Sequence, residues 1–123
     1  MPTILVVDDE QEVRAVVSRF FKKKGYEVVV AEDAEEAIGL LEKERVDAVL
    51  LDIELPGMSG VEALGRIRAR WRDMPVVMIS GQQDEEVAKD TLRYGAFDYM
   101  VKPIDFDYLE RTVYLKLVEK LAH

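Results

Sequence analysis

Short apolar runs alternate along the chain with longer stretches in which apolar side chains recur every three or four residues. Apolar runs bounded by turn residues are typical of strands buried on both faces, whereas the wider spacing is typical of helices with one apolar face. The runs predict five strands, at residues 4–7, 27–31, 46–51, 75–79 and 98–101. Each strand precedes a stretch with helical spacing, and these stretches predict five helices, around residues 13–21, 34–41, 61–67, 87–92 and 106–121.

Several residues between these elements have the form of helix caps and helix stops. Asp33, with Glu36 three residues later, predicts a capping box, and Asp84 predicts a second N-cap. Gly25 and Gly95 follow helical stretches at positions where a glycine commonly ends a helix.

The connections between the predicted elements are short. After the third strand, Pro56 and Gly57 predict a turn, and Gly60 is expected to allow either a close backbone approach or an unusual dihedral angle. Strands that alternate with helices form a parallel sheet covered on both faces, because parallel strands require crossover connections. We find no second domain, internal repeat or low-complexity tract, and predict one domain over residues 1–123.

Composition and charge exclude several classes of function. The formal net charge of −8 argues against nucleic-acid binding and against adhesion to an anionic membrane, because both require clustered Lys and Arg. Without cysteine, the chain has no disulfide framework and no thiolate metal site. No apolar run approaches the roughly 20 residues that span a bilayer, and the first residues lack the pattern of a signal peptide. We therefore expect a soluble cytoplasmic protein.

Hydrophilic side chains follow four of the predicted strands where each strand ends: Asp8 and Asp9 the first, Asp52 the third, Ser80 the fourth and Lys102 the fifth. The carboxyl ends of parallel strands meet at one edge, where ligand sites of such sheets lie. Three neighbouring carboxylates repel one another unless a cation intervenes, and all-oxygen ligands suit Mg²⁺. A metal and a lysine beside a carboxylate can position a phosphoryl group, and the central, single Asp52 is the natural nucleophile.

Together these motifs resemble the receiver domain of two-component response regulators, similar to the single-domain chemotaxis regulator. The resemblance covers essentially the whole chain and is carried by Val6-Val-Asp8-Asp9, Leu51-Asp52, Pro56-Gly57-Met-Ser-Gly60, Ser80-Gly81 and Gly95-Ala-Phe-Asp-Tyr99-Met-Val-Lys102-Pro103. It implies an α/β, flavodoxin-like, doubly wound (βα)5 fold. The five-stranded parallel sheet of that fold has the strand order 2-1-3-4-5, with helices on both faces.

The resemblance also implies the roles of the acidic residues and the lysine. Asp52 would be the phosphoacceptor, and Asp9 and Asp52 would bind Mg²⁺ directly. Asp8 would act through water, and the backbone carbonyl of Glu54 would be a further ligand. Lys102 would contact the phosphoryl group.

A second set of roles concerns the switch. Ser80 would be the hydroxyl that turns toward the phosphoryl group, and Tyr99 the aromatic residue that moves with it. The Lys102–Pro103 bond would be cis. Glu54 and Gln82 occupy variable positions beside the expected phosphoryl site, which in the family tune the lifetime of the phosphoryl group.

The implied partners are a sensor histidine kinase or phosphotransfer protein, or a small phosphodonor, and an output domain or protein. The last helix carries apolar residues beyond those that one buried face requires, so we expect a partner surface there. We hypothesise that the fourth helix, fifth strand and fifth helix form a contact face, through which the chain could also form a homodimer. The residues of this face are Lys89, Arg93, Tyr99, Tyr108 and Leu115. The chain would be a signalling module, which assists its own phosphorylation and dephosphorylation, and not a turnover enzyme.

Three other functions are open to this pattern. A Mg²⁺-dependent phosphohydrolase with an aspartyl nucleophile would need a general acid, for which Glu54 is the nearby candidate, and a substrate cap, for which no insertion exists. A flavin-binding module would need a hydroxyl- or glycine-rich loop where Asp8 and Asp9 stand. A degenerate receiver that acts only as a scaffold disagrees with the complete set of acids, hydroxyl and lysine.

Individual residues also have plainer interpretations. Asp8 and Asp9 could simply cap the first helix, and Ser80 could belong to an ordinary turn. The arginines of the third helix are expected on its solvated side: Arg66, Arg68, Arg70 and Arg72. His123, the only histidine, is assigned no catalytic or metal role.

Overall fold

The structure, a computed structural model, describes residues 1–121, so His123 lies outside the described residues. Its elements follow one another as β1 (Thr3–Val7), α1 (Gln11–Lys23), β2 (Glu27–Ala31), α2 (Ala34–Lys43), β3 (Ala48–Asp52), α3 (Gly60–Arg70), β4 (Val76–Ser80), α4 (Glu85–Arg93), β5 (Asp98–Val101) and α5 (Phe106–Leu121). All strand pairs are parallel, and the order β2-β1-β3-β4-β5 confirms the predicted doubly wound sheet.

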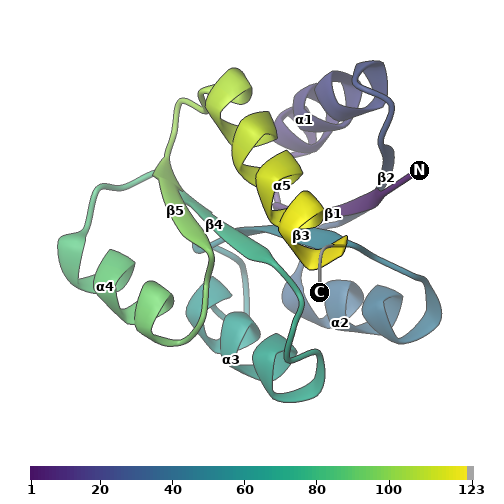
Figure 1. Cartoon of the computed structure of the whole chain (residues 1–123). Coiled ribbons are helices and arrows are strands. Elements are labelled where there is room, and N and C mark those ends of the chain that lie inside the picture. Colours follow the sequence, from purple (N-terminus) through teal and green to yellow (C-terminus); the bar gives the residue numbers. More distant parts are fainter. Residues whose placement is uncertain (122–123) are drawn as a thin grey trace.

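Helices cover both faces of the sheet, α1 and α5 on one side and α2, α3 and α4 on the other (Figure 1). Alternate strand residues point into two separate hydrophobic clusters. In β3, for example, Leu50 packs with residues of α1 and α5, whereas Leu51 packs with residues of α2 and α3. This double burial explains why the central strands are continuous apolar runs.

Two strands end one residue later than the sequence pattern predicts. Asp52 and Ser80 are the last residues of β3 and β4, paired in register with Ile79 and Val101. The backbone hydrogen bonds continue past these polar side chains, since Lys102 N–H donates to the Ser80 carbonyl at 2.7 Å. The sheet itself therefore positions both side chains.

The predicted N-caps and helix stops are confirmed. Asp33 accepts a hydrogen bond from Glu36 N–H at 2.8 Å, whereas the Glu36 carboxylate accepts one at 2.7 Å from Glu32 N–H, one residue before the N-cap, and not from Asp33 N–H as in a capping box. Gly25 and Gly95 have φ angles of +94° and +103°, which glycine adopts without steric cost. These caps define where α1, α2 and α4 begin or end.

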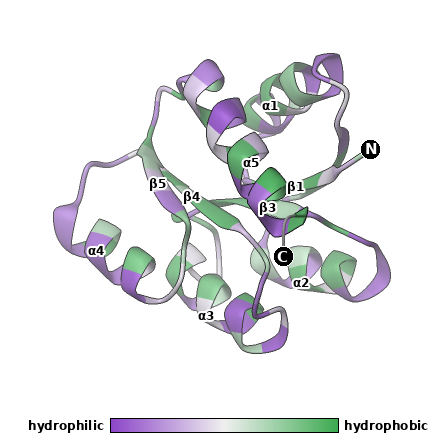
Figure 2. Cartoon of the chain, viewed as in Figure 1, coloured by the Kyte–Doolittle hydropathy of each residue, from purple (hydrophilic) through white to green (hydrophobic). Residues whose placement is uncertain are grey.

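The packing of α4 differs from the prediction. Asp84 caps this helix as expected, by accepting from Glu86 N–H and Val87 N–H. However, Leu92, expected on the buried side, is 48% exposed, and Thr91 is the buried residue of α4. In Figure 2, α4 carries long hydrophilic stretches, whereas β4 is mostly hydrophobic. The helix thus leaves the apolar side chain of Leu92 on the surface.

The glycines after β3 have different roles. Gly57 has a φ of +75° in the turn, whereas Gly60 begins α3 directly against the end of β3. A Cβ atom at Gly60 would overlap the Asp52 carbonyl oxygen and lie 2.6 Å from Ile53 Cα. Of the two explanations offered for Gly60, the close approach is therefore the correct one.

Arg68 corrects the prediction for the arginines of α3. Arg66 and Arg70 are exposed as expected, but Arg68 is half-buried. Its guanidinium donates to the carbonyls of Met74 and Gly95, each at 2.7 Å, and ties the end of α3 to the loop before β5. Within residues 1–121, no helix is long and apolar enough to cross a membrane.

Candidate functional site

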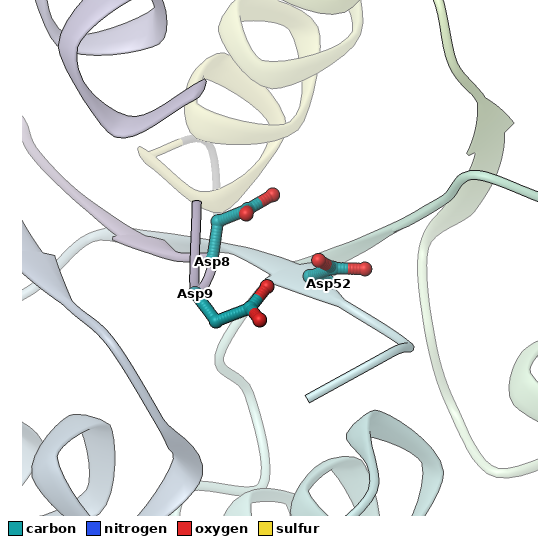
Figure 3. A group of neighbouring side chains, drawn as sticks. All are labelled: Asp8, Asp9 and Asp52. Atoms are coloured by element: carbon teal, nitrogen blue, oxygen red, sulfur yellow. The ribbon is translucent and has the colours of Figure 1, made fainter. Parts of the chain in front are cut away.

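The three aspartates lie together at the carboxyl edge of the sheet. Asp8 and Asp9 follow β1, and Asp52 ends the neighbouring β3 (Figure 3). One carboxylate oxygen of each lies within 4.8 Å of the others. Asp8 and Asp52 are each only 3% exposed, whereas Asp9 faces solvent. The structure thus brings together the acids that the sequence places at two strand ends.

Lys102 joins this cluster from the end of β5. Its Nζ lies 3.2 Å from Asp8 Oδ2 and 3.6 Å from Asp52 Oδ2, and the bond to Pro103 is cis, as the resemblance implied. Burial alone would lower the pKa of Lys102, but the charge of Asp52 and the hydrogen bond to Asp8 outweigh it and raise that pKa. Lys102 is therefore an ammonium at neutral pH.

The charge of the cluster is not balanced by this one lysine. Burial, reinforced by the charge of Asp8, raises the pKa of Asp52 to about 7, although Glu54 N–H and Lys102 favour the carboxylate. Three carboxylates that share one ammonium leave excess negative charge in a largely buried place. A divalent cation would neutralise it, and this all-oxygen set fits a hard ion such as Mg²⁺.

Asp8 is held by backbone and side-chain contacts. Its Oδ1 accepts a hydrogen bond from Glu10 N–H at 2.8 Å, and its carbonyl oxygen accepts one from Arg14 Nη1 at 2.7 Å. Arg14 also lies 3.6 Å from Glu32, at the end of the neighbouring β2. Arg14 was not among the predicted site residues, because nothing in its spacing distinguishes it from a solvent-facing helix residue.

The Ser80 hydroxyl contacts Glu54 and Gln82 rather than the aspartates or the side chain of Lys102. Ser80 Oγ donates to Glu54 Oε2 at 2.7 Å, and Gly81 N–H donates to Glu54 Oε1 at 2.8 Å. Both oxygens of one carboxylate are thus bound to the start of the loop after β4. The roles predicted for Glu54, as a backbone metal ligand, a variable position beside the phosphoryl site and the candidate general acid of a phosphohydrolase, did not include this side-chain contact.

Tyr99 is connected to the same loop. Gln82 N–H donates to Ser80 Oγ at 3.0 Å, and the Gln82 carbonyl accepts a hydrogen bond from Tyr99 Oη at 3.0 Å. Tyr99 itself is half-buried. A continuous series of hydrogen bonds therefore runs from Glu54 through Ser80 and Gln82 to Tyr99.

The hypothesised contact face is exposed in large part. Tyr108 and Leu115 on α5 are 44% and 62% exposed, and Lys89 and Arg93 on α4 are also exposed. Tyr108 Oη donates to Asp98 Oδ2 at 2.8 Å, which connects the first turns of α5 to the start of β5. The face thus combines apolar and basic side chains.

Comparison with known proteins agrees with this site. A family model described as "Response regulator receiver domain" matches residues 4–114. Regulatory protein AtoC of Escherichia coli is 39% identical over 110 residues, which make up 89% of this chain and 24% of AtoC. The chain spans about a quarter to a third of the length of the first curated relatives that it matches.

Two solved structures show the same fold. A CheY-like response regulator receiver domain protein from Methanospirillum hungatei is 30% identical, with a TM-score of 0.94 and coverage of 99% of this chain and 98% of its own. The response regulator TrrA from Thermotoga maritima, solved in complex with Mg²⁺-BeF, is 34% identical, with a TM-score of 0.86 and coverage of 94% and 99%.

Proposed function

The chain belongs to the response regulator receiver domains, the phosphoaccepting modules of two-component signalling, and we propose that Asp52 is its phosphoacceptor and residues 1–123 its receiver domain. The observation that carries this proposal is the cluster itself. Carboxylate oxygens of Asp8, Asp9 and Asp52 lie within 4.8 Å of one another, and Lys102 Nζ lies 3.6 Å from Asp52. Of the three acids, Asp52 is the one at the end of the central strand β3.

In the proposed reaction, a carboxylate oxygen of Asp52 attacks the phosphorus of a phosphohistidine or of a small acyl phosphate. A new O–P bond forms, the bond between phosphorus and the donor atom breaks, and the donor leaves with the electron pair. Lys102 stabilises negative charge on the transferring phosphoryl oxygens. It also favours the ionised form of Asp52, which is the nucleophilic form.

Receiver domains bind Mg²⁺ at an aspartate cluster, and we propose that Asp8, Asp9, Asp52 and the backbone carbonyl of Glu54 hold the ion in this chain. When bound, the ion would neutralise charge on the acids and on the incoming phosphoryl group. Support comes from the excess negative charge described above and from TrrA, whose structure contains Mg²⁺-BeF.

We propose Ser80 and Tyr99 as the residues that respond. An aspartyl phosphate adds nearly two negative charges beside Lys102 and supplies new hydrogen-bond acceptors. Ser80 and Tyr99 belong to one series of hydrogen bonds, so a change at the hydroxyl reaches the surface beside β5. If this part of the chain has two conformations, a phosphoryl group that interacts better with one of them shifts the equilibrium toward that conformation.

Receiver domains are signalling modules, and we propose phosphotransfer partners and an output partner for this one. A sensor histidine kinase or phosphotransfer protein would supply the phosphoryl group. The output domain or protein, or a second copy of the chain, would bind the face made by α4, β5 and α5.

The proposed acceptor is tested by intact-mass measurement after incubation with acetyl phosphate and Mg²⁺. We expect one added phosphoryl group on the parent chain and none on Asp52→Asn or after chelation of the metal. A parent chain that gains no mass and also fails to bind beryllium fluoride with Mg²⁺ would contradict the proposal and favour a degenerate receiver. Phosphoryl transfer to Asp52→Asn would place the acceptor elsewhere.

A further inference from the structure

We propose that the Glu54 carboxylate competes with the phosphoryl group for two hydrogen-bond donors, Ser80 Oγ–H and Gly81 N–H, and must leave them before the phosphoryl group is fully bound. This inference rests on the proposed function, because it concerns how the aspartyl phosphate would be received. Glu54 acts through other residues and is therefore a positioning residue.

The contact follows from the arrangement of two adjacent strands. Asp52, the last residue of β3, is paired with Ile79 of β4, so the segment after β3 runs beside the end of β4. Glu54, two residues further on, reaches across to Ser80 Oγ at 2.7 Å and Gly81 N–H at 2.8 Å. Each oxygen of the carboxylate accepts one of these bonds, which fixes both the loop and the side chain.

Competition follows from the number of available hydrogens. Ser80 Oγ has one hydrogen to donate, and its acceptors are Glu54 Oε2 at 2.7 Å and, at the longer distance of 3.0 Å, the Gln82 carbonyl. Gly81 N–H has one hydrogen, which it donates to Glu54. A phosphoryl oxygen at Asp52 that uses Ser80 must take this hydrogen from the carboxylate. The Glu54 charge also repels an anionic phosphoryl group in the same place.

The same contact influences the conformation of the loop before phosphorylation. The Ser80 hydroxyl accepts a hydrogen bond from Gln82 N–H, and the Gln82 carbonyl accepts one from Tyr99 Oη, each at 3.0 Å. Removal of Glu54 would free the Ser80 hydroxyl to reorient. We therefore expect a change at Tyr99 even in the unphosphorylated chain.

The first test is titration with beryllium fluoride in the presence of Mg²⁺, for the full chain with Glu54 intact, Glu54→Ala and Glu54→Gln. Both substitutions keep the backbone carbonyl proposed as a metal ligand. We expect Glu54→Ala to bind the mimic about tenfold more tightly, because two charge-assisted hydrogen bonds no longer have to be broken. Glu54→Gln, which loses the charge but keeps one acceptor, should fall between the two.

Glu85→Ala is the matched control. Glu85 lies exposed in the first turn of α4, beyond the same loop, and its removal changes the net charge by the same amount. We expect less than a twofold change for this variant. A gain equal to that of Glu54→Ala would show that net charge alone is responsible and would overturn the inference.

A double-mutant cycle with Ser80→Ala isolates the contact. Without the hydroxyl, the gain from Glu54→Ala should fall to about threefold, because only Gly81 N–H remains in competition. An unchanged gain would contradict the proposed partner. As a spectroscopic readout, the ring NMR signals of Tyr99 should shift in unliganded Glu54→Ala and not in Glu85→Ala.

The two proposals fail in different ways. If the parent chain binds beryllium fluoride with Mg²⁺ and Glu54→Ala binds it equally or more weakly while remaining folded, the competition is wrong and the phosphoacceptor function stands. If neither binds it and Asp52→Asn behaves identically, the proposed function fails and the inference fails with it. Thermal melting of each variant establishes that it is folded.

Discussion

At the scale of single residues, the site depends on a carboxylate kept from water. Asp52 is 3% exposed, and burial raises its pKa to about 7 from an ordinary 3.8. At a pH between these two pKa values, Asp52 is protonated in the folded chain and ionised in the unfolded chain. Without metal, the free energy of unfolding should therefore fall as the pH rises from about 4 to 7.

This pH dependence is testable with Asp52→Asn. The amide carries no charge, so the variant should lack the decline and should be more stable than the parent at pH 8 by about 4 kcal/mol, in the absence of metal. Urea unfolding with a chelator present, from pH 4 to 8, measures both chains. Mg²⁺ should restore most of the lost stability to the parent chain and should not stabilise Asp52→Asn. If the free energy of unfolding changes with pH in the same way for both chains, the proposal that the buried Asp52 carboxylate destabilises the fold is wrong.

Residue types predicted most of the site but not all of its contacts. The positions of Asp8, Asp9, Asp52 and Lys102 follow from strand ends, which the apolar runs reveal. The side chain of Glu54 contacts Ser80, 26 residues away along the chain, and only the pairing of β3 with β4 makes them neighbours.

At the scale of elements, the junction between β3 and α3 is sterically constrained. Gly60→Ala would place a Cβ atom against the backbone of Asp52 and Ile53, the latter 2.6 Å away at Cα. Backbone atoms cannot yield as a flexible side chain can, so we expect a loss of about 2–4 kcal/mol in the free energy of unfolding. Urea denaturation at constant pH measures this loss.

Gly65→Ala is the control within the same helix. Beyond its chain neighbours and the backbone of its own helix, no atom lies within 4 Å of the position that its Cβ would take, and alanine favours helix over glycine. This variant should be more stable by about 0.5–1 kcal/mol. If Gly60→Ala and Gly65→Ala lowered the free energy of unfolding equally, the cause would be the replacement of a helical glycine in general and not the close backbone approach at Gly60.

The spacing of apolar residues predicted part of the buried face of α4 wrongly. The spacing of Val87, Ala88 and Leu92 predicts a buried face for α4, yet Leu92 is exposed and Thr91 is buried. The rotation of a short helix depends on what packs against it, and periodicity does not supply that partner. The same holds for Arg68, whose partners lie on segments before β4 and β5.

At the scale of the whole molecule, the exposed face of α4, β5 and α5 should self-associate if the chain is a phosphorylation-dependent homodimer. Light scattering over a concentration series should then give a mass near that of the monomer without beryllium fluoride and approach twice that value with it. Leu115→Asp, at a position 62% exposed, should remain monomeric because it places a charge within the apolar part of the face.

Val16→Asp controls for the loss of an exposed apolar side chain. Val16 is 46% exposed on α1, which lies beside α5 and is not part of the face made by α4, β5 and α5, so its substitution should leave the mass unchanged. A constant mass across the parent series would exclude the homodimer and leave other partners for this face.

By itself, the sequence determined the features that depend on local chemistry and on chain order. Apolar periodicity, caps and turn glycines determined the elements, and their alternation determined a parallel sheet with its polar strand ends at one edge. Only the tertiary structure decided the separation of the acids, the raised pKa of Asp52, the exposure of Leu92 and the bonds of Glu54. These properties depend on burial and on contacts between segments distant in the chain, which residue spacing does not encode.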